Sequence, residues 1–259
     1  VKPYVKRQKN AAADAEAICE AVTRPSMRFV PIKSAKRKGV MMLHRTRDLL
    51  MRQRTMMLNA IRAHLAEFGI ITAQGPHKLA ALLDTLDEDR LPAIARSALT
   101  SLTAQLDSLA AEIRTLEHQL MAWHRTDETS QRLETIPGVG LMTATALSAS
   151  IPDPSVFKTG RQFAAFLGLV PRQNSSGGKE RLGRISKMGD GYLRRLLVVG
   201  ATSVIRRAGT NTSATGEWVR RLLERKPARV ATVAMANKTA RIAWAVLVRG
   251  ETYRAPAMA

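Results

Sequence analysis

A pair of serines followed by a pair of glycines stands in a basic, loop-like stretch of the chain, residues 171–190. The pairs are Ser175-Ser176 and Gly177-Gly178. The same stretch contains five cationic side chains: Arg172, Lys179, Arg181, Arg184 and Lys187. Paired glycines allow backbone N–H groups to form an anion-binding concavity, and cationic side chains neutralise phosphates. The composition therefore predicts a phosphate-contacting loop, although the G-x-x-x-x-G-K-[ST] spacing of a Walker A loop is absent. Taken alone, the serines are ordinary loop residues.

A second glycine motif, Ile-Pro-Gly-Val-Gly at residues 136–140, lies between two stretches of helical pattern. This is the form of a helix-hairpin-helix turn. In such a turn Gly138 and Gly140 would let the backbone approach a phosphate, and the N–H groups that open the next helix would point at the anion. The alternative is a tight helix–helix turn with the same glycine requirement, and the basic composition of the chain favours phosphate contact.

Residues that could hold a catalytic metal are scarce in the sequence. Asp14 and Glu16 have no carboxylate at helical spacing on their N-terminal side, where positions 10 and 11 are Asn and Ala, whereas a two-metal nuclease needs several carboxylates. The histidines lie on predicted helices without ligand spacing, and we interpret them as surface or seam residues. They are His44, His64, His77, His118 and His124.

The overall charge of the chain indicates what class of partner it binds. The 259 residues include 41 Lys and Arg against 21 Asp and Glu, a net charge of +20, which favours nucleic acid as the partner. No apolar run approaches the roughly 18 residues of a membrane span. The single cysteine, Cys19, excludes an internal disulfide framework and a multi-cysteine zinc site, and it favours a reducing compartment. An aromatic content of 4% argues against RNA binding built mainly on base stacking.

Helices must position these residues. The pattern predicts helices at 11–22, 34–68 and 77–86, and a weak strand at 28–32. A heptad seam then follows, with steps of three and four. Its members are Leu99, Leu102, Leu106, Leu109, Ile113, Leu116 and Leu120. This spacing favours a left-handed coiled coil with the 34–68 helix as an antiparallel partner, or equally a helical hairpin folded on itself within one chain.

Past residue 126 glycine and proline recur, and a second domain is expected. Its predicted helices are 141–150, 161–167, 191–207, 217–225 and 230–248. The start at Val1-Lys2-Pro3 suggests the downstream part of a longer protein.

Several segments together resemble the transposases of the insertion-sequence one-ten family, its eleven-eleven subgroup in particular. These segments are residues 6–18, 28–31, 43–50, 136–140 and 166–195. The resemblance spans nearly the whole chain. It implies RNA-guided DNA recombination, with a RuvC-like domain that holds Mg²⁺ through a DEDD acidic set, a coiled-coil segment and a C-terminal domain with a nucleophilic serine. A structured bridge RNA would pair with donor and target DNA.

Carried over to this sequence, the resemblance implies that Ser176 is the nucleophile, with Ser175 as the alternative. Asp14 matches the last acid of the set and would be a metal ligand, whereas Ala11 replaces the third. The resemblance also adds Arg194 and Arg195 to the nucleic-acid-binding residues. With Asp14 alone, we expect no Mg²⁺ and no strand cleavage from this chain by itself.

These observations predict a mainly α protein in three parts. They are a RuvC-like remnant at 1–33, an antiparallel coiled-coil arm at 34–126 and a helical transposase domain with a helix-hairpin-helix-like turn at 127–259. The expected function is DNA recombination of an insertion sequence, with DNA, bridge RNA and further copies of the chain, as a dimer or tetramer through the coiled coil, as partners. The expected location is the bacterial cytoplasm, at the nucleoid. The alternatives are a non-catalytic nucleic-acid-binding remnant and a structure-selective junction nuclease, which would need the missing acids.

Overall fold

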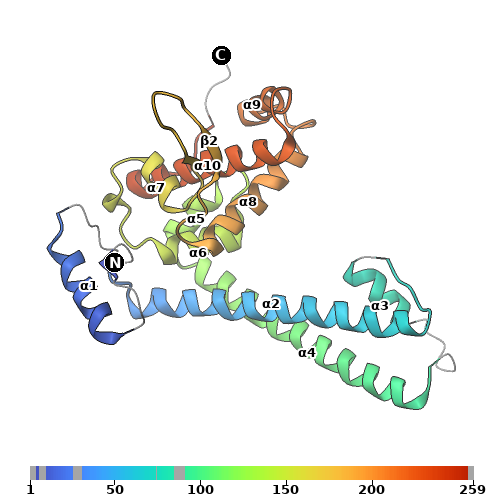
Figure 1. The fold of residues 1–259 in the computed structure, drawn as a ribbon. Coiled ribbons are helices and arrows are strands. Elements are labelled where there is room, and N and C mark those ends of the chain that lie inside the picture. Colours follow the sequence, from blue (N-terminus) through green and yellow to red (C-terminus); the bar gives the residue numbers. More distant parts are fainter. Residues whose placement is uncertain (1–3, 6–9, 26–30, 74, 85–90, 256–259) are drawn as a thin grey trace.

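The computed structural model describes residues 4–5, 10–25, 31–73, 75–84 and 91–255. They form a mainly helical fold with one two-stranded sheet, as the sequence predicts (Figure 1). The first part of the fold contains α1 (Ala11–Thr23), α2 (Ala35–Glu67), α3 (Pro76–Asp84) and α4 (Ala93–His124). Then come α5 (Glu128–Glu134), α6 (Leu141–Ser150), a short 3-10 turn (Pro154–Val156) and α7 (Gly160–Phe166). The last elements are β1 (Pro171–Gln173), β2 (Leu182–Ile185), α8 (Gly191–Arg206), α9 (Ala214–Leu223) and α10 (Ala228–Arg249).

Helix boundaries follow local chemistry. Ser34 caps α2 by accepting a hydrogen bond from the Arg37 N–H at 3.3 Å, and Asp190 caps α8 in the same way. Gly250 ends α10 in the left-handed conformation, with φ of 68°. Such side chains and glycines satisfy backbone groups that a helix end leaves unpaired. The helices predicted at 34–68 and 141–150 are confirmed, and α5 lies outside the sequence prediction.

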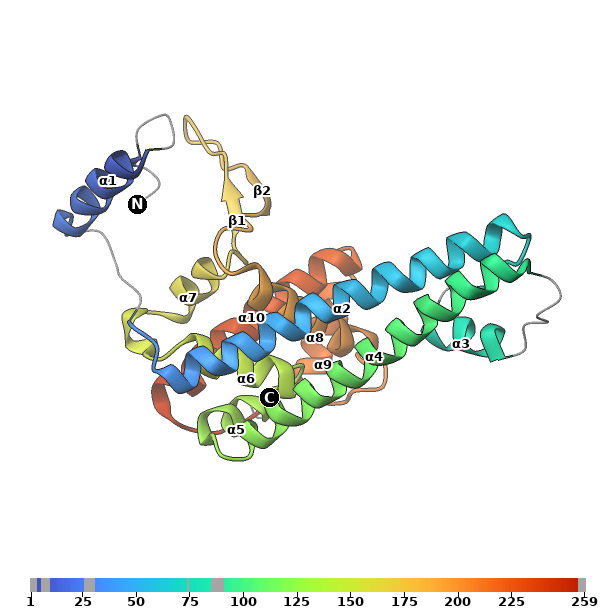
Figure 2. The same cartoon turned by 90° about the horizontal axis from the view of Figure 1, so that it is seen from below.

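The heptad seam packs on α2 of the same chain. Figures 1 and 2 show α2 and α4 lying side by side as an antiparallel pair that projects from the rest of the molecule. Leu109, Ile113 and Leu120 of the seam are buried, and Leu99, Leu102 and Leu106 pack on the apolar cluster around Ile61 and Leu65. The structure therefore contains the helical hairpin within one chain.

The main hydrophobic core lies in the C-terminal half. It joins the inner faces of α6, α7, α8 and α10, with Leu147, Phe163, Leu197 and Ala240 fully buried. Helix α6 also packs on α2, so that α6 and α8 lie between α2 and α10 (Figure 1). The first half of α2 is therefore attached to the C-terminal half of the chain, and only its second half is in the free arm.

Two expectations about local structure need correction. The sequence predicts a loop at 171–190, but most of this segment forms an antiparallel hairpin in which Pro171 pairs with Ile185 and Gln173 with Leu182. The predicted strand at 28–32 falls largely on residues outside the described ranges, and Pro31 and Ile32 are not in a strand. Among the described helices, none is long and apolar enough to cross a membrane.

Candidate nucleic-acid interface

A groove of about 760 Å³ lies where α2, the start of α6 and α8 meet. We call it the α2–α6–α8 groove. Its walls include Arg47 and Arg52 of α2, Gly140 before α6, and Tyr192 and Arg195 of α8. The glycine turn and the Arg195 position that the sequence singled out therefore face one hollow. The α2 arginines lie outside the sequence prediction.

Close packing accounts for one of the two glycines of the turn. Gly138 has φ of 84°, and a Cβ there would meet Val204 Cγ2 at 2.8 Å and the Gly200 carbonyl oxygen at 2.9 Å. A Cβ on Gly200 would lie 1.8 Å from the Gly138 carbonyl oxygen. The turn therefore packs backbone to backbone on α8. This packing explains Gly138 as a residue of a tight helix–helix turn.

Gly140 has a different environment. An added Cβ would meet nothing within 4 Å, and no side chain caps the helix that follows it. The Gly140 carbonyl accepts hydrogen bonds from the Thr143 and Ala144 N–H groups, both at 2.9 Å. The open N-terminus of α6 thus points its positive dipole end toward the groove, which favours an anion there.

Ion pairs hold the arginines of the groove in place. Arg47 Nη2 lies 2.6 Å from Glu117 Oε1 of α4. Arg195 pairs with Asp48, and Arg52 Nε lies 3.7 Å from the other oxygen of the same carboxylate. The Arg195 guanidinium also lies 5.3 Å from the centroid of the Tyr192 ring. One carboxylate is shared by two arginines, so their charge is only partly compensated and a phosphate could bind beside it.

A buried polar chain lies under the groove. His44 of α2 is fully buried; its Nδ1 lies 2.9 Å from the Tyr192 hydroxyl and its Nε2 lies 3.0 Å from Thr145 Oγ1. The Thr145 hydroxyl donates to the Leu141 carbonyl at 2.7 Å. It therefore accepts from His44 Nε2, and Nδ1 accepts from Tyr192. Burial, with the charge of Arg47, lowers the pKa of His44 from 6.5 to about 4, so the ring is neutral. Burial also raises the pKa of Tyr192.

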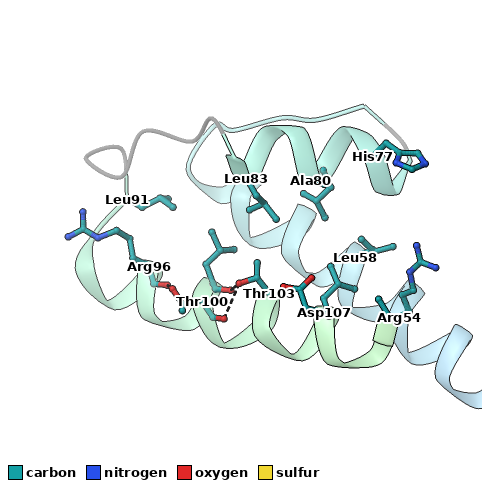
Figure 3. Close-up of a pocket in the computed structure, with 14 residues that line it drawn as sticks. Arg54, Leu58, His77, Ala80, Leu83, Leu91, Arg96, Thr100, Thr103 and Asp107 are labelled. Atoms are coloured by element: carbon teal, nitrogen blue, oxygen red, sulfur yellow. Dashed lines mark hydrogen bonds between the residues drawn. The ribbon is translucent and has the colours of Figure 1, made fainter. Parts of the chain in front are cut away.

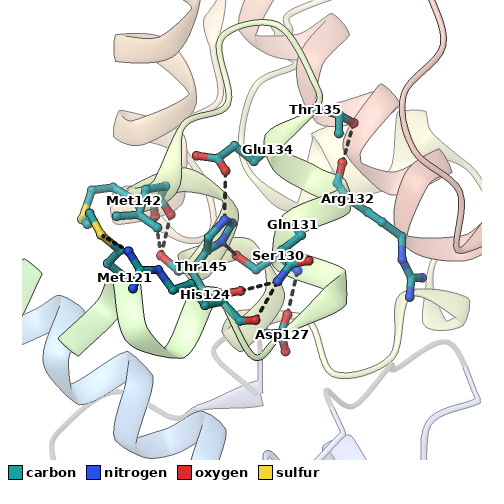
Figure 4. Close-up of polar contacts among 12 residues, drawn as sticks. Met121, His124, Asp127, Ser130, Gln131, Arg132, Glu134, Thr135, Met142 and Thr145 are labelled. Atoms are coloured by element: carbon teal, nitrogen blue, oxygen red, sulfur yellow. Dashed lines mark hydrogen bonds and ion pairs between the residues drawn. The ribbon is translucent and has the colours of Figure 1, made fainter. Parts of the chain in front are cut away.

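A second buried histidine fixes the joint between the arm and the glycine turn (Figure 4). His124, at the end of α4, contacts Ser130 Oγ at 2.7 Å and Glu134 Oε2 at 2.9 Å. Asp127 accepts hydrogen bonds from the Ser130 N–H at 2.6 Å and from the Ser148 hydroxyl at 2.8 Å. These contacts bind α4, α5 and α6 together. The interpretation of His44 and His124 as surface or seam residues is wrong, because packing between helices buries both side chains. No local sequence pattern reveals this packing.

The serine pair lies at the tip of the β1–β2 hairpin. Gly177 and Gly178 have φ of 56° and 75°, and the Lys179 N–H donates to the Ser176 carbonyl at 3.1 Å. Two positive φ values are what a type I′ hairpin turn requires. The glycines are thereby explained by the turn, and the predicted anion-binding concavity has no separate support.

The two serines differ in their contacts. Ser175 Oγ accepts a hydrogen bond from the Arg181 N–H at 3.1 Å across the hairpin. Ser176 is exposed, and no hydrogen bond of its hydroxyl is found within the described part of the chain. Ser175 therefore contributes to the hairpin, and Ser176 presents its side chain to solvent.

The predicted basic residues divide into two groups. Lys179, Arg181, Arg184 and Lys187 are exposed along the hairpin, and Arg172 donates to the Ser186 carbonyl at 3.3 Å. Arg194 is half-buried, and its Nη1 donates to the Leu167 and Met188 carbonyls at 3.0 and 3.4 Å. Arg194 therefore fastens the root of the hairpin, and its neighbour Arg195 faces the groove.

Asp14 lies on neither the groove nor the hairpin. It is exposed in the first turn of α1, and its N–H donates to the Asn10 carbonyl at 3.0 Å. Within the described ranges, no three His, Cys, Asp or Glu side chains are grouped as a metal site requires. One exposed carboxylate does not fit a catalytic Mg²⁺ site.

Another hollow, of about 550 Å³, lies at the far end of the arm between α2, α3 and α4 (Figure 3). Leu58, Leu83, Leu91 and Leu106 line it, with Arg54 and Arg96 among its polar residues. The seam is thus open on one side where α2 and α4 diverge.

Known proteins resemble this chain along almost its whole length. The sequence profile described as "Transposase IS116/IS110/IS902 family" matches residues 130–216. A "Probable family 20 transposase" of Pseudomonas aeruginosa is 50% identical over 258 residues, 98% of this chain and 76% of that protein. The transposases for insertion sequence elements IS1328 of Yersinia enterocolitica and IS1111A of Coxiella burnetii are each 42% identical over 98% of this chain. The chain spans 76% and 71% of those two proteins. The chain therefore belongs to the IS116/IS110/IS902 family of insertion-sequence transposases.

Proposed function

We propose that this insertion-sequence transposase holds the phosphate backbone of DNA in the α2–α6–α8 groove. The observation that carries the proposal is the meeting of an uncapped helix N-terminus with Arg47, Arg52 and Arg195 in one hollow. Backbone N–H groups and arginines contact phosphates without reading base sequence. This matches a protein whose sequence choice is made by base pairing to a guide.

Binding would proceed by exchange of partners at Asp48. Arg195 and Arg52 share this carboxylate, and their side chains are 51% and 65% exposed. A phosphate entering beside Gly140 would take one arginine from Asp48, while Arg47 stays with Glu117 and keeps the wall in place. The neutral His44 would hold the Tyr192 ring, on which Arg195 lies.

We further propose that Ser176 is the nucleophile of strand cleavage. Its exposed hydroxyl at the hairpin tip supports the assignment, as does the structural contact that occupies Ser175. A serine hydroxyl needs activation by a base or by charge stabilisation at the phosphate. Lys179 and Arg181 could supply the charge. We propose that the acids of a RuvC-like domain complete the site.

Further proposals rest on the family. They are bridge-RNA guidance, assembly as a dimer or tetramer through the α2–α4 arm, and a cytoplasmic location at the nucleoid. We also propose that this chain alone is inactive and that cleavage needs Mg²⁺ bound by further acids, because Asp14 is the one residue matched to the acidic set of the family. The described residues by themselves do not fit Mg²⁺.

The groove is tested by the salt dependence of duplex DNA binding. The variant Arg52→Gln/Arg195→Gln should bind labelled duplex less tightly and lower the log–log salt slope by about 0.9 for each phosphate that the variant no longer neutralises. Arg229→Gln/Arg249→Gln, at two exposed arginines outside the groove, also removes two charges; it is the matched control and should leave the slope unchanged. Equal slopes for the double variant and the control would reject the groove as the binding surface.

A further inference from the structure

A further cleft, of about 710 Å³, is formed by α7, α9 and α10. None of these helices lines the α2–α6–α8 groove. The cleft contains Trp218 and Trp244, two of the three tryptophans of the chain, together with Arg161, Lys238 and Arg241. Aromatic and cationic residues are thus gathered in a space whose size is typical of small-ligand sites.

The charge of this cleft is uncompensated. None of the described residues that line it is acidic. Lys238 Nζ lies 4.1 Å from the centroid of the Trp218 ring, and burial together with the nearby charge of Arg241 lowers the pKa of Lys238. An ammonium resting on an indole has no anionic partner there, so an entering anion would be favoured.

The walls of the cleft are held firmly. The Trp244 indole N–H donates to the Phe157 carbonyl at 3.2 Å. A Cβ on Gly160 would lie 3.1 Å from the Arg241 carbonyl oxygen, so the start of α7 lies directly against α10. These contacts fix the tryptophan, the helix start and α10 relative to one another, which preorganises the cleft.

The cleft also adjoins the hairpin that carries Ser176. Asn237, which lines the cleft, donates from Nδ2 to the Leu169 carbonyl at 3.1 Å. Leu169 stands two residues before β1 begins at Pro171. The root of the hairpin is therefore fastened to a wall of the cleft.

We propose that the α7–α9–α10 cleft binds an unpaired nucleotide of single-stranded nucleic acid. The base stacks on an indole, Lys238 moves from the Trp218 ring to a phosphate, and Arg161 and Arg241 contact the flanking backbone. Aromatic stacking next to a cationic track is how proteins bind single strands without reading sequence. The proposal rests on the proposed function only in that both concern nucleic acid, because the two sites share no residue.

Tryptophan fluorescence tests the cleft directly. In a Trp123→Phe background the emission comes from Trp218 and Trp244, and an oligo-dT or oligo-U strand should quench it. An abasic oligonucleotide of equal length, which keeps the phosphates, should quench little and bind about tenfold more weakly. Tighter binding of oligo-dT would identify a DNA strand as the ligand, and tighter binding of oligo-U an RNA strand. Either result supports the cleft.

Two variants of the cleft keep the test informative even if one of them does not fold. Trp218→Leu should weaken oligo-dT binding about tenfold. If that variant fails to fold, Lys238→Gln/Arg241→Gln, which changes a half-buried lysine and an exposed arginine, should also weaken binding. Arg249→Gln is the control outside the cleft. Absence of quenching, or equal quenching by abasic and normal strands, would overturn the proposal. If duplex binding were still weakened by the Arg52→Gln/Arg195→Gln change in that case, the proposed DNA-binding role of the groove would be retained and only the cleft proposal would be rejected.

Discussion

A 2.9 Å hydrogen bond joins His44 Nδ1 on α2 to the Tyr192 hydroxyl on α8, across 148 positions of sequence. The histidine is fully buried, and the tyrosine supports Arg195 at the wall of the α2–α6–α8 groove. The first half of α2 and the C-terminal half of the chain are therefore connected by a neutral polar contact directly below the proposed DNA surface.

This contact predicts a dependence of stability on pH. The pKa of His44 lies at about 4 in the folded chain and at 6.5 as the ordinary value. The unfolded chain therefore takes up a proton that the folded chain refuses, and the free energy of unfolding falls as the pH drops from about 6.5 to about 4. The loss should be about 3 kcal/mol. Urea unfolding of the wild type and of His44→Gln at both pH values measures it, and equal losses in the two proteins would contradict the assignment.

The packing of the glycine turn on α8 predicts that replacing Gly200 and replacing Gly140 by alanine will differ in their cost to stability. Gly200→Ala places a methyl group against the Gly138 carbonyl and should cost about 2 kcal/mol or more of unfolding free energy. Gly140→Ala enters open space and should cost well under that. Thermal or denaturant unfolding compares them. A tolerated Gly200→Ala would show that the turn does not lie against α8.

The two serines should separate in function. In a complete family member, replacing the residue at the position of Ser176 by Ala should abolish the covalent protein–DNA adduct. Replacing Ser175 should mainly weaken the hairpin, since its hydroxyl accepts the Arg181 N–H. Adduct capture on a guided substrate distinguishes them. If the adduct is lost only with Ser175→Ala, the nucleophile is Ser175. If the adduct forms in both alanine variants, neither serine is the nucleophile and the hairpin only contacts phosphates.

The hairpin cations should contribute to salt-sensitive binding. Replacing Arg181, Arg184 and Lys187 together by Gln should lower the slope by up to about 2.7, at about 0.9 per phosphate on duplex DNA. The exposed Arg225, Arg229 and Arg249 form a matched control set. Filter binding across a salt series gives the slopes. An unchanged slope for the hairpin variant would place the hairpin away from the nucleic acid.

The open side of the arm seam predicts self-association. Leu106 is half-buried and lines the hollow at the arm end, so Leu106→Glu should shift sedimentation toward a smaller species. Gln105→Glu adds the same charge at an exposed neighbour and should leave the size unchanged. Circular dichroism checks that both variants remain helical. If Leu106→Glu leaves the size of the oligomer unchanged, the seam is not the interface between the chains.

The sequence by itself determined most of the helices and the family, although it did not predict α5. Apolar spacing, the cap at Ser34 and the breakers around Gly138 are local signals, and they placed α2, α4 and α6 closely. The basic composition indicated a polyanion, and the matched segments indicated the transposase family that the comparisons show. These features are readable because a helix is specified by neighbours three and four positions apart.

Only the tertiary structure decided which residues meet. Asp48 and Arg195 are 147 positions apart, and nothing in either segment reports the other. His44 resembles a surface histidine of an amphipathic helix until α6 and α8 cover it. Gly177 and Gly178 fit a flexible loop as well as a hairpin turn, because both need positive φ, and the pairing of β1 with β2 settled the choice. Burial and long-range pairing depend on how helix faces pack against one another, which a periodicity along one segment does not encode.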